Sequence, residues 1–209
     1  MHATADGVLV AFHDRTLDRV TDRTGAIASL PAREVQLARI DGTDPIPLLA
    51  DLLGAWPDVR VNIDVKDAPA TRPLADVIRR TGAWDRVCVT SFSPRRLRAI
   101  RALLDRPVCM ATSLIGAGAL WLGVPRRFLA PALADRWVRC AQLPIQLVTA
   151  PLIGRAHASG LHVHGWTVND KDMMTALLDR GVDGIMTDRT ETLREVLIAR
   201  SQWYPRGGS

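Results

Sequence analysis

The stretch of residues 59–66, Val-Arg-Val-Asn-Ile-Asp-Val-Lys, alternates apolar and polar side chains along almost its whole length. Successive side chains of a β-strand point to opposite faces of the strand. One face therefore carries Val61, Ile63 and Val65, and the other carries Asn62, Asp64 and Lys66. The pattern predicts a barrel strand whose apolar face packs under helices. Its polar face is expected to point inward near the carboxyl end of the strand, where barrel enzymes place their sites.

Six more apolar runs alternate with helical patterns along the chain. They are Val8–Phe12, Val87–Phe92, Pro107–Ala111, Val138–Leu143, Leu161–Val168 and Gly184–Thr187. Strands that alternate with helices of about 10–15 residues are typical of βαβ units and a parallel sheet. No Gly-x-Gly-x-x-Gly follows any of these strands, so the dinucleotide-binding version of such a sheet is not supported.

Capping residues predict where four of the helices begin. The helices are Leu48–Ala55 opened by Pro47, Arg95–Leu104 after Ser93-Pro94, Lys171–Arg180 capped by Asn169 or Asp170, and Glu191–Arg200 capped by Asp188. Serine, aspartate and asparagine side chains accept hydrogen bonds from the first N–H groups of a helix, and proline fits its first turn. Gly181 is expected to end the third of these helices, because glycine tolerates the left-handed conformation there.

The length of 209 residues fits a closed barrel from which one unit is missing. A (β/α)₈ barrel typically needs about 250 residues, and a βαβ unit takes about 30. Asp6-Gly7 is a tight-turn pair, and we expect the first arm of its hairpin at or before Met1, as if the natural chain started earlier. The predicted fold is an α/β, TIM-type (β/α)₈ barrel in residues 1–200 that lacks the first strand–helix unit and part of the second strand. A tail over residues 201–209 follows it.

The composition is that of an ordinary globular protein, with 47% hydrophobic and 23% charged residues. The formal net charge is +5, but the arginines are scattered, and no zinc-finger, RRM or basic-zipper motif accompanies them, so nucleic-acid binding is not expected. The longest apolar run, Leu114–Val124, is too short to span a bilayer. The three isolated cysteines, Cys88, Cys109 and Cys140, indicate small buried residues in a reducing, cytoplasmic compartment.

Three polar residues are candidates for chemistry. The Asp64 carboxylate can bind a hard divalent cation, and Lys66 can neutralise a phosphate oxygen. The alternative for this pair is a plain salt bridge on one face of an exposed strand. His13 ends an apolar strand and could serve as a general acid or base near neutral pH. The alternative for His13 is a loop histidine that has no catalytic role.

Several motifs follow one another in an order that resembles the glycerophosphodiester phosphodiesterase family. Residues 13–25, His-Asp-Arg-Thr-Leu-Asp-Arg-Val-Thr-Asp-Arg-Thr-Gly, resemble the second histidine motif of that family. The later blocks are Ile46-Pro47-Leu48, residues 62–66, Thr90-Ser91-Phe92, residues 166–169 (Trp-Thr-Val-Asn) and residues 181–188 (Gly-Val-Asp-Gly-Ile-Met-Thr-Asp). Each block is weak alone, and together they cover the chain from one end to the other.

The resemblance implies a metal-dependent phosphoric diester hydrolase on a TIM-type barrel. Such an enzyme cleaves glycerophosphodiesters, as small-molecule substrates, to glycerol 3-phosphate and an alcohol. It uses one divalent metal ion (Mg or Ca), three metal-binding carboxylates and two catalytic histidines. Carried to this chain, His13 is the second catalytic histidine, Asp64 the third metal-binding carboxylate and Lys66 the phosphate-steadying cation. Phe92 and Trp166 would line the substrate pocket.

Three departures from the family pattern affect the expected activity. Asp64 stands where the family often has glutamate. The His-Arg-Gly motif and the Glu-x-Asp metal pair are absent, and the aspartate of that pair would fall immediately before Met1. Because one carboxylate binds a divalent ion poorly, we expect this chain alone to be feeble or inactive.

Other interpretations stay open. His162 and His164 share a strand face with Trp166 and could ligate zinc in an amidohydrolase-like enzyme. A truncated barrel could act as a non-catalytic binding or interaction protein. The run Leu114–Val124, with Arg126 and Arg127, could lie on a membrane surface. His2 is expected to be an exposed terminal histidine. The sequence does not indicate an oligomeric state.

Overall fold

The computed structural model describes residues 1–124 and 137–204 of the chain. They fall into two compact units, Met1–Ser113 and Leu114–Ser209. Arg126, Arg127 and the last five residues of the predicted tail lie outside the described residues.

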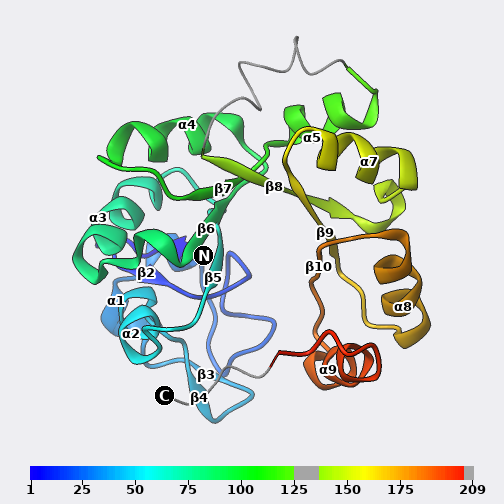
Figure 1. Ribbon diagram of the computed structural model, residues 1–209. Helices are drawn as coiled ribbons and strands as arrows, with labels where there is room; N and C mark the ends of the chain where they lie inside the picture. The colour runs from blue at the N-terminus through cyan, green and yellow to red at the C-terminus, as the bar shows by residue number, and fades with distance from the viewer. Residues whose placement is uncertain (125–136, 205–209) are drawn as a thin grey trace. The chain divides into compact units, whose positions relative to one another are not determined.

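Three parallel strands form the sheet of the first unit. They are β5 (Val61–Asp64), β6 (Val87–Thr90) and β7 (Cys109–Ala111). Helix α3 (Thr71–Thr81) connects β5 to β6, and α4 (Pro94–Leu103) connects β6 to β7. The two helices pack against each other along one side of these strands (Figure 1). These connections are βαβ units, so the parallel α/β architecture predicted from the sequence is confirmed in this unit.

The predicted alternation along β5 is also confirmed. Ile63 and Val65 are buried, whereas Asn62 is exposed and both Asp64 and Lys66 are half-buried. The apolar face therefore lies in the core, and the polar face remains accessible at the carboxyl end of the strand.

An antiparallel hairpin begins the chain, with β1 (His2–Ala3) paired to β2 (Leu9–Val10). Its turn contains Asp6-Gly7 as predicted, and Gly7 adopts a φ of +79° that favours glycine. The prediction that the first arm lies at or before Met1 is wrong, because His2 pairs with Val10 and Ala3 with Leu9.

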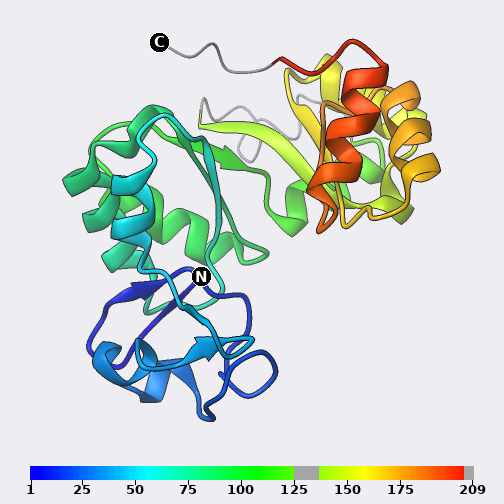
Figure 2. The same ribbon diagram turned by 90° about the horizontal axis from the view of Figure 1, so that it is seen from below.

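Several short elements lie with this hairpin at one end of the β5–β7 strands (Figure 2). They are η1 (Ile27–Ser29), α1 (Ala32–Val35), β3 (Arg39–Ile40) and β4 (Asp44–Pro45). Helix α2 (Leu49–Ala55) packs against α3, and η2 (Ala83–Asp85) lies between α3 and the start of β6. An apolar cluster holds this end together: Val10, Phe12, Leu17, Ile27, Val35, Ala38 and Ile46. Phe12 is buried next to His13, so the strand end that carries this histidine is anchored in the core.

The second unit has three parallel strands and, among its described residues, four α-helices and one 3₁₀-helix. The strands are β8 (Val138–Pro144), β9 (His162–Trp166) and β10 (Gly184–Ile185). The helical segments are α5 (Leu114–Trp121), η3 (Ile145–Leu147), α7 (Ala150–Ala158), α8 (Lys171–Arg180) and α9 (Thr190–Ala199). Their apolar faces meet in one core centred on residues such as Leu143, Leu152, Val163 and Leu177. The α/β prediction is confirmed here as well, and the eight-unit barrel with its missing first unit stays a prediction.

Two of the predicted caps are confirmed, and one is wrong. Ser93 accepts a hydrogen bond from the Arg96 N–H at 3.4 Å, and Asp170 accepts one from the Met173 N–H at 2.8 Å. Asp188 does not cap α9, which begins at Thr190 after Arg189. The reason is position, because Arg189 occupies the N-cap of α9 and Asp188 lies one residue before it, where its carboxylate accepts a hydrogen bond from the Asn169 amide at 3.0 Å.

Helix α5 is apolar on both of its faces. Leu120 is buried in the core of the second unit, whereas Leu114, Ile115 and Trp121 are exposed. No helix among the described residues is both long enough and apolar enough to cross a membrane. Of the three cysteines that were predicted to be buried, Cys140 is buried, whereas Cys88 and Cys109 are half-buried.

Candidate functional site

The carboxyl end of β5 brings two of the predicted residues into direct contact. The Lys66 ammonium donates a hydrogen bond to Oδ2 of Asp64 at 2.7 Å, and both side chains are partly exposed. The salt bridge that the sequence left open as an alternative is therefore present. It lies at the end of a parallel strand, which is also where the functional interpretation places the site.

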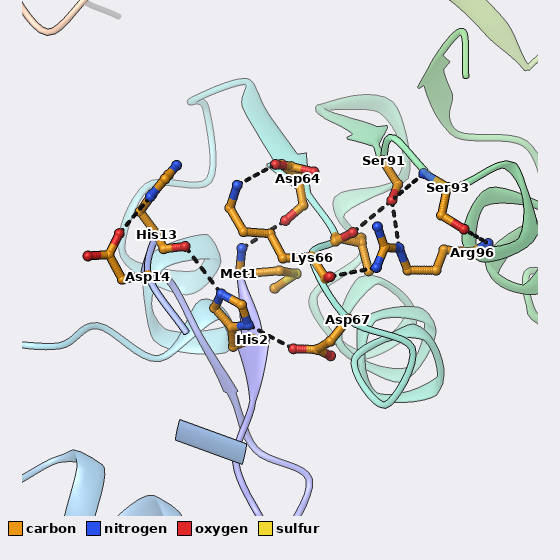
Figure 3. Close-up of polar contacts among 11 residues, drawn as sticks. Met1, His2, His13, Asp14, Asp64, Lys66, Asp67, Ser91, Ser93 and Arg96 are labelled. Carbon is orange, nitrogen blue, oxygen red and sulfur yellow. Dashed lines mark hydrogen bonds and ion pairs between the residues drawn. The ribbon is translucent and has the colours of Figure 1, made fainter. Parts of the chain in front are cut away.

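Polar contacts from the neighbouring elements fix this strand end from two sides (Figure 3). The Met1 ammonium donates to the Asp64 carbonyl oxygen at 2.7 Å. The Arg96 guanidinium donates to the Lys66 carbonyl oxygen and, through Nε, to Oγ of Ser91 at 2.8 Å. Arg96 was not among the residues predicted from the sequence. Its position on the first turn of α4, directly after the Ser91-Phe92 block, was the available signal.

His13 is held by a carboxylate next to it in the chain. Its imidazole is largely exposed, at 79%, and Nδ1 lies 2.8 Å from Oδ1 of Asp14. Arg19 also pairs with Asp14, and the hydrogen bonds from Arg19 and then His13 hold the pKa of Asp14 well below its usual range. Asp14 is therefore a carboxylate at neutral pH. With Nδ1 bonded to it, Nε2 is the nitrogen of His13 that can exchange a proton with a bound molecule.

His2 is not the exposed terminal histidine that we predicted, because only 3% of the residue is exposed. Its Nδ1 lies 2.8 Å from Oδ2 of Asp67, and its Nε2 lies 3.2 Å from the His13 carbonyl oxygen. The correction has a physical cause: pairing of β1 with β2 places His2 in the interior, where Asp67 supplies a partner. Asp67 also accepts the Ala70 N–H at 2.9 Å.

Burial and hydrogen bonding act in opposite directions on the pKa of Asp67. Burial raises the pKa of its carboxyl group, but the hydrogen bonds from His2 and from the Ala70 N–H outweigh burial and lower the pKa overall. Asp67 is thus ionised at neutral pH. It follows Lys66 directly in the chain, so His2 joins the segment that carries Lys66 to the segment that carries His13.

The two predicted pocket residues belong to different units. Phe92 comes directly after β6 in the first unit and is 56% exposed. Trp166 is the last residue of β9 in the second unit and is half-buried. Each lies at or just beyond the carboxyl end of a parallel strand. Their role in a substrate pocket stays a prediction.

A second polar cluster lies at the start of β9. The Asp183 carboxylate accepts hydrogen bonds from the Val163 N–H at 2.7 Å and from His157 at 2.8 Å, and it pairs with His162 at 3.2 Å. Further along the strand, His164 packs against Gly184 of β10, where an added Cβ would lie 2.8 Å from the ring. No group of three histidines or carboxylates that could hold a metal ion occurs in residues 1–124 and 137–204. The described residues therefore offer the zinc interpretation no third ligand.

The residues around Asp64 supply only part of the ligand set that a divalent ion requires. A hard cation requires several oxygen ligands, and Asp64 supplies one carboxylate that is already paired with Lys66. Within the part of the chain that the structure describes, no second carboxylate joins it in a metal-binding group. Asp64 alone does not make a divalent metal site.

Comparison with known proteins gives a consistent result. Residues 1–192 match the model of the glycerophosphoryl diester phosphodiesterase family. A relative from Mycobacterium tuberculosis, described as a probable glycerophosphodiester phosphodiesterase 2, is 46% identical over 97% of this chain and 79% of its own length. A solved structure of a putative glycerophosphoryl diester phosphodiesterase from Agrobacterium tumefaciens is 25% identical, covers 96% of this chain and 84% of its own, and has a TM-score of 0.75.

A more distant structure supports the same fold. A phosphodiesterase from Oleispira antarctica, solved in complex with the product sn-glycerol 3-phosphate, is 18% identical with a TM-score of 0.77. The match covers 94% of this chain and 82% of the other.

Proposed function

The chain belongs to the glycerophosphoryl diester phosphodiesterase family, and from this premise we propose that it hydrolyses glycerophosphodiesters to glycerol 3-phosphate and an alcohol. The family comprises phosphoric diester hydrolases, and the relatives are named for this activity. One observation carries the proposal: His13, oriented by Asp14, and the Lys66–Asp64 pair lie on segments that His2 ties together.

His13 is the proposed general acid or base. Asp14 accepts a hydrogen bond from Nδ1 and fixes the plane of the ring, so that Nε2 moves a proton to or from the alcohol oxygen of the substrate. The exposed position of the imidazole allows a small molecule to reach Nε2.

Lys66 is the proposed partner of the phosphoryl oxygens. Its ammonium group can stabilise negative charge that develops on these oxygens in the transition state. In the structure the ammonium is paired with Asp64, so a bound phosphodiester would compete with this carboxylate or share the cation with it.

Asp64 is the residue of this chain that we propose as a ligand of a divalent ion, Mg or Ca. One carboxylate is an incomplete ligand set, so no step of the proposed reaction is assigned to a metal ion here. For the same reason we expect this chain to hydrolyse its substrate slowly. Phe92 and Trp166 are proposed to contact the apolar parts of the substrate.

The test is the release of glycerol 3-phosphate from glycerophosphocholine, glycerophosphoethanolamine, glycerophosphoinositol and glycerophosphoglycerol, with and without added Mg²⁺ or Ca²⁺. Replacing His13 with alanine should lower the rate roughly 10²- to 10⁴-fold, the usual contribution of general acid–base catalysis. The matched control is His162→Ala, which removes an exposed histidine of the second unit and should leave the rate unchanged. Equal rates in wild type and His13→Ala would exclude the proposed role of His13.

The alternative is a barrel that binds the product or substrate without cleaving it. Its support is the single carboxylate beside Lys66. Saturable binding of glycerol 3-phosphate that Lys66→Met weakens, without release of alcohol from any diester in the panel, would favour this alternative.

A further inference from the structure

The side chain of His2 is enclosed by two groups that both accept hydrogen bonds. Its Nε2 lies 3.2 Å from the carbonyl oxygen of His13, and its Nδ1 lies 2.8 Å from a carboxylate oxygen of Asp67 (Figure 3). The residue is almost completely buried, so water does not readily replace either partner.

The chemistry of these partners determines which nitrogens carry protons. A carbonyl oxygen has no proton to give, so Nε2 must donate. Asp67 is ionised, since its pKa is lowered and its other oxygen accepts the Ala70 N–H, and a carboxylate likewise only accepts. Both ring nitrogens therefore donate, which requires the doubly protonated imidazolium form. The result is an ion pair between the buried His2 and the half-buried Asp67.

The position of this pair links the two halves of the proposed site. The carbonyl group that His2 contacts belongs to His13, the proposed acid or base, and Asp67 directly follows Lys66. The opposite side of the Lys66 segment is fixed by Arg96, which donates to the Lys66 carbonyl oxygen. Hydrogen bonds, in addition to packing, therefore hold the backbone at His13 and at Lys66.

We propose that His2 is a positioning residue for the reaction, a doubly protonated imidazole that fixes the backbone of His13 relative to the segment carrying Lys66. The role in catalysis rests on the proposed function, whereas the ion pair and the positioning of His13 do not. His2 does not itself touch the reacting atoms in this scheme. It acts through the main-chain carbonyl group of His13 and through Asp67, the residue that follows Lys66.

The first measurement reads the protonation state directly. Protein labelled with ¹⁵N-histidine, carrying an affinity tag without histidine at its C-terminus, is studied by long-range ¹H–¹⁵N correlation spectra near pH 7.5. The five histidines are assigned with single variants. We expect His2 to show the nearly equal ring-nitrogen shifts of an imidazolium. In Asp67→Asn the asparagine amide can donate to Nδ1, so His2 should change to the split pattern of a neutral ring.

The second measurement reads positioning. The ring and amide signals of His13 should shift in His2→Phe, which removes both donors while keeping a flat ring, and should shift less in Asp67→Asn. His162→Phe, the matched change at an exposed histidine, should leave His13 unmoved. A neutral His2 in the wild type, or His13 signals unaffected by His2→Phe in a variant with native circular dichroism, would overturn the proposal.

Kinetics separate this inference from the proposed function. If the chain releases glycerol 3-phosphate, His2→Phe should lower kcat roughly 10- to 100-fold, the loss typical of a small misplacement of a catalytic group, and should change KM little. Unchanged kcat would overturn the catalytic role of His2. If no diester is cleaved by any variant while the spectra behave as expected, the proposed hydrolysis fails, but the ion pair and its positioning of His13 stand.

Discussion

Replacing Asp183 with alanine should destabilise the second unit far more than replacing other partly exposed aspartates of the chain. Asp183 precedes β10, and its own N–H donates to the Val163 carbonyl oxygen at 2.9 Å. Its side chain accepts the Val163 N–H in return, at 2.7 Å. This reciprocal pair closes the beginning of β9 against the segment that leads into β10.

The magnitude follows from the burial of each partner. Val163 is fully buried, so its N–H loses its partner in Asp183→Ala, at a cost of about 1–3 kcal/mol. His157 is 43% exposed, so the loss of its pairing with Asp183 adds only about 0–1 kcal/mol. We expect the free energy of unfolding to fall by roughly 2–3 kcal/mol. Asp183→Asn, which keeps an acceptor for Val163, should lose about 1 kcal/mol or less.

Urea unfolding followed by circular dichroism and by tryptophan fluorescence measures these changes, with the slope against urea checked for each variant. The matched control is Asp179→Ala, which removes the exposed ion pair with Arg200 and should cost about 0–1 kcal/mol. A loss in Asp183→Ala no larger than that of Asp179→Ala would refute the argument from the buried Val163 N–H.

The same carboxylate gives a pH dependence of defined sign. Burial raises the pKa of Asp183, but the hydrogen bonds from Val163, His157 and His162 lower it overall, so the folded pKa lies below the unfolded value of about 3.9. A lowered folded pKa means that the stabilisation is fully present above the unfolded pKa and is lost as pH falls through the folded pKa. The stability difference between wild type and Asp183→Asn should therefore shrink as pH falls below about 4.

Three further predictions concern the proposed site. Lys66→Met should lower kcat/KM for diester hydrolysis roughly 10²- to 10³-fold by removing charge stabilisation at the phosphoryl oxygens, and Lys66→Arg, which keeps the charge, should lose less in the same assay. Asp14→Asn should lower kcat roughly 10- to 100-fold because His13 loses the carboxylate that orients Nδ1; unchanged kcat would show that Asp14 only pairs with Arg19. Calorimetric titration with Mg²⁺ or Ca²⁺ should give a Kd of about 1 mM or weaker that Asp64→Asn abolishes, and a micromolar Kd would reveal ligands beyond Asp64.

Local patterns in the sequence predicted the parts of the fold that depend on neighbouring residues. The alternation in residues 59–66 predicted β5 with its buried and polar faces, because side-chain direction in a strand depends only on residue order. The caps Ser93 and Asp170 were predictable for the same reason, since each bonds an N–H three residues away. The prediction at Asp188 was wrong because α9 begins one residue later than expected, with Arg189 at the N-cap, and the Asp188 carboxylate bonds to Asn169, 19 residues earlier.

In the candidate site, too, contacts between near residues were predictable and contacts between distant residues were not. The contact of Asp64 with Lys66 joins residues two positions apart on one strand face, and the sequence indicated it. The contact of His2 with Asp67 joins residues 65 positions apart, so no local pattern indicated that His2 would be buried. Arg96 was missed for a similar reason, because its partner, the Lys66 carbonyl oxygen, lies 30 positions away on another element.

The close packing of His164 on Gly184 has a consequence for how the sequence can change over time. The two residues pair across β9 and β10, and the ring of one occupies the space that a Cβ on the other would need. Position 184 can then not gain a side chain while the histidine ring at position 164 stays where it is. Among descendants of this protein, we expect alanine or serine at position 184 to appear only after, or together with, a residue smaller than histidine at position 164.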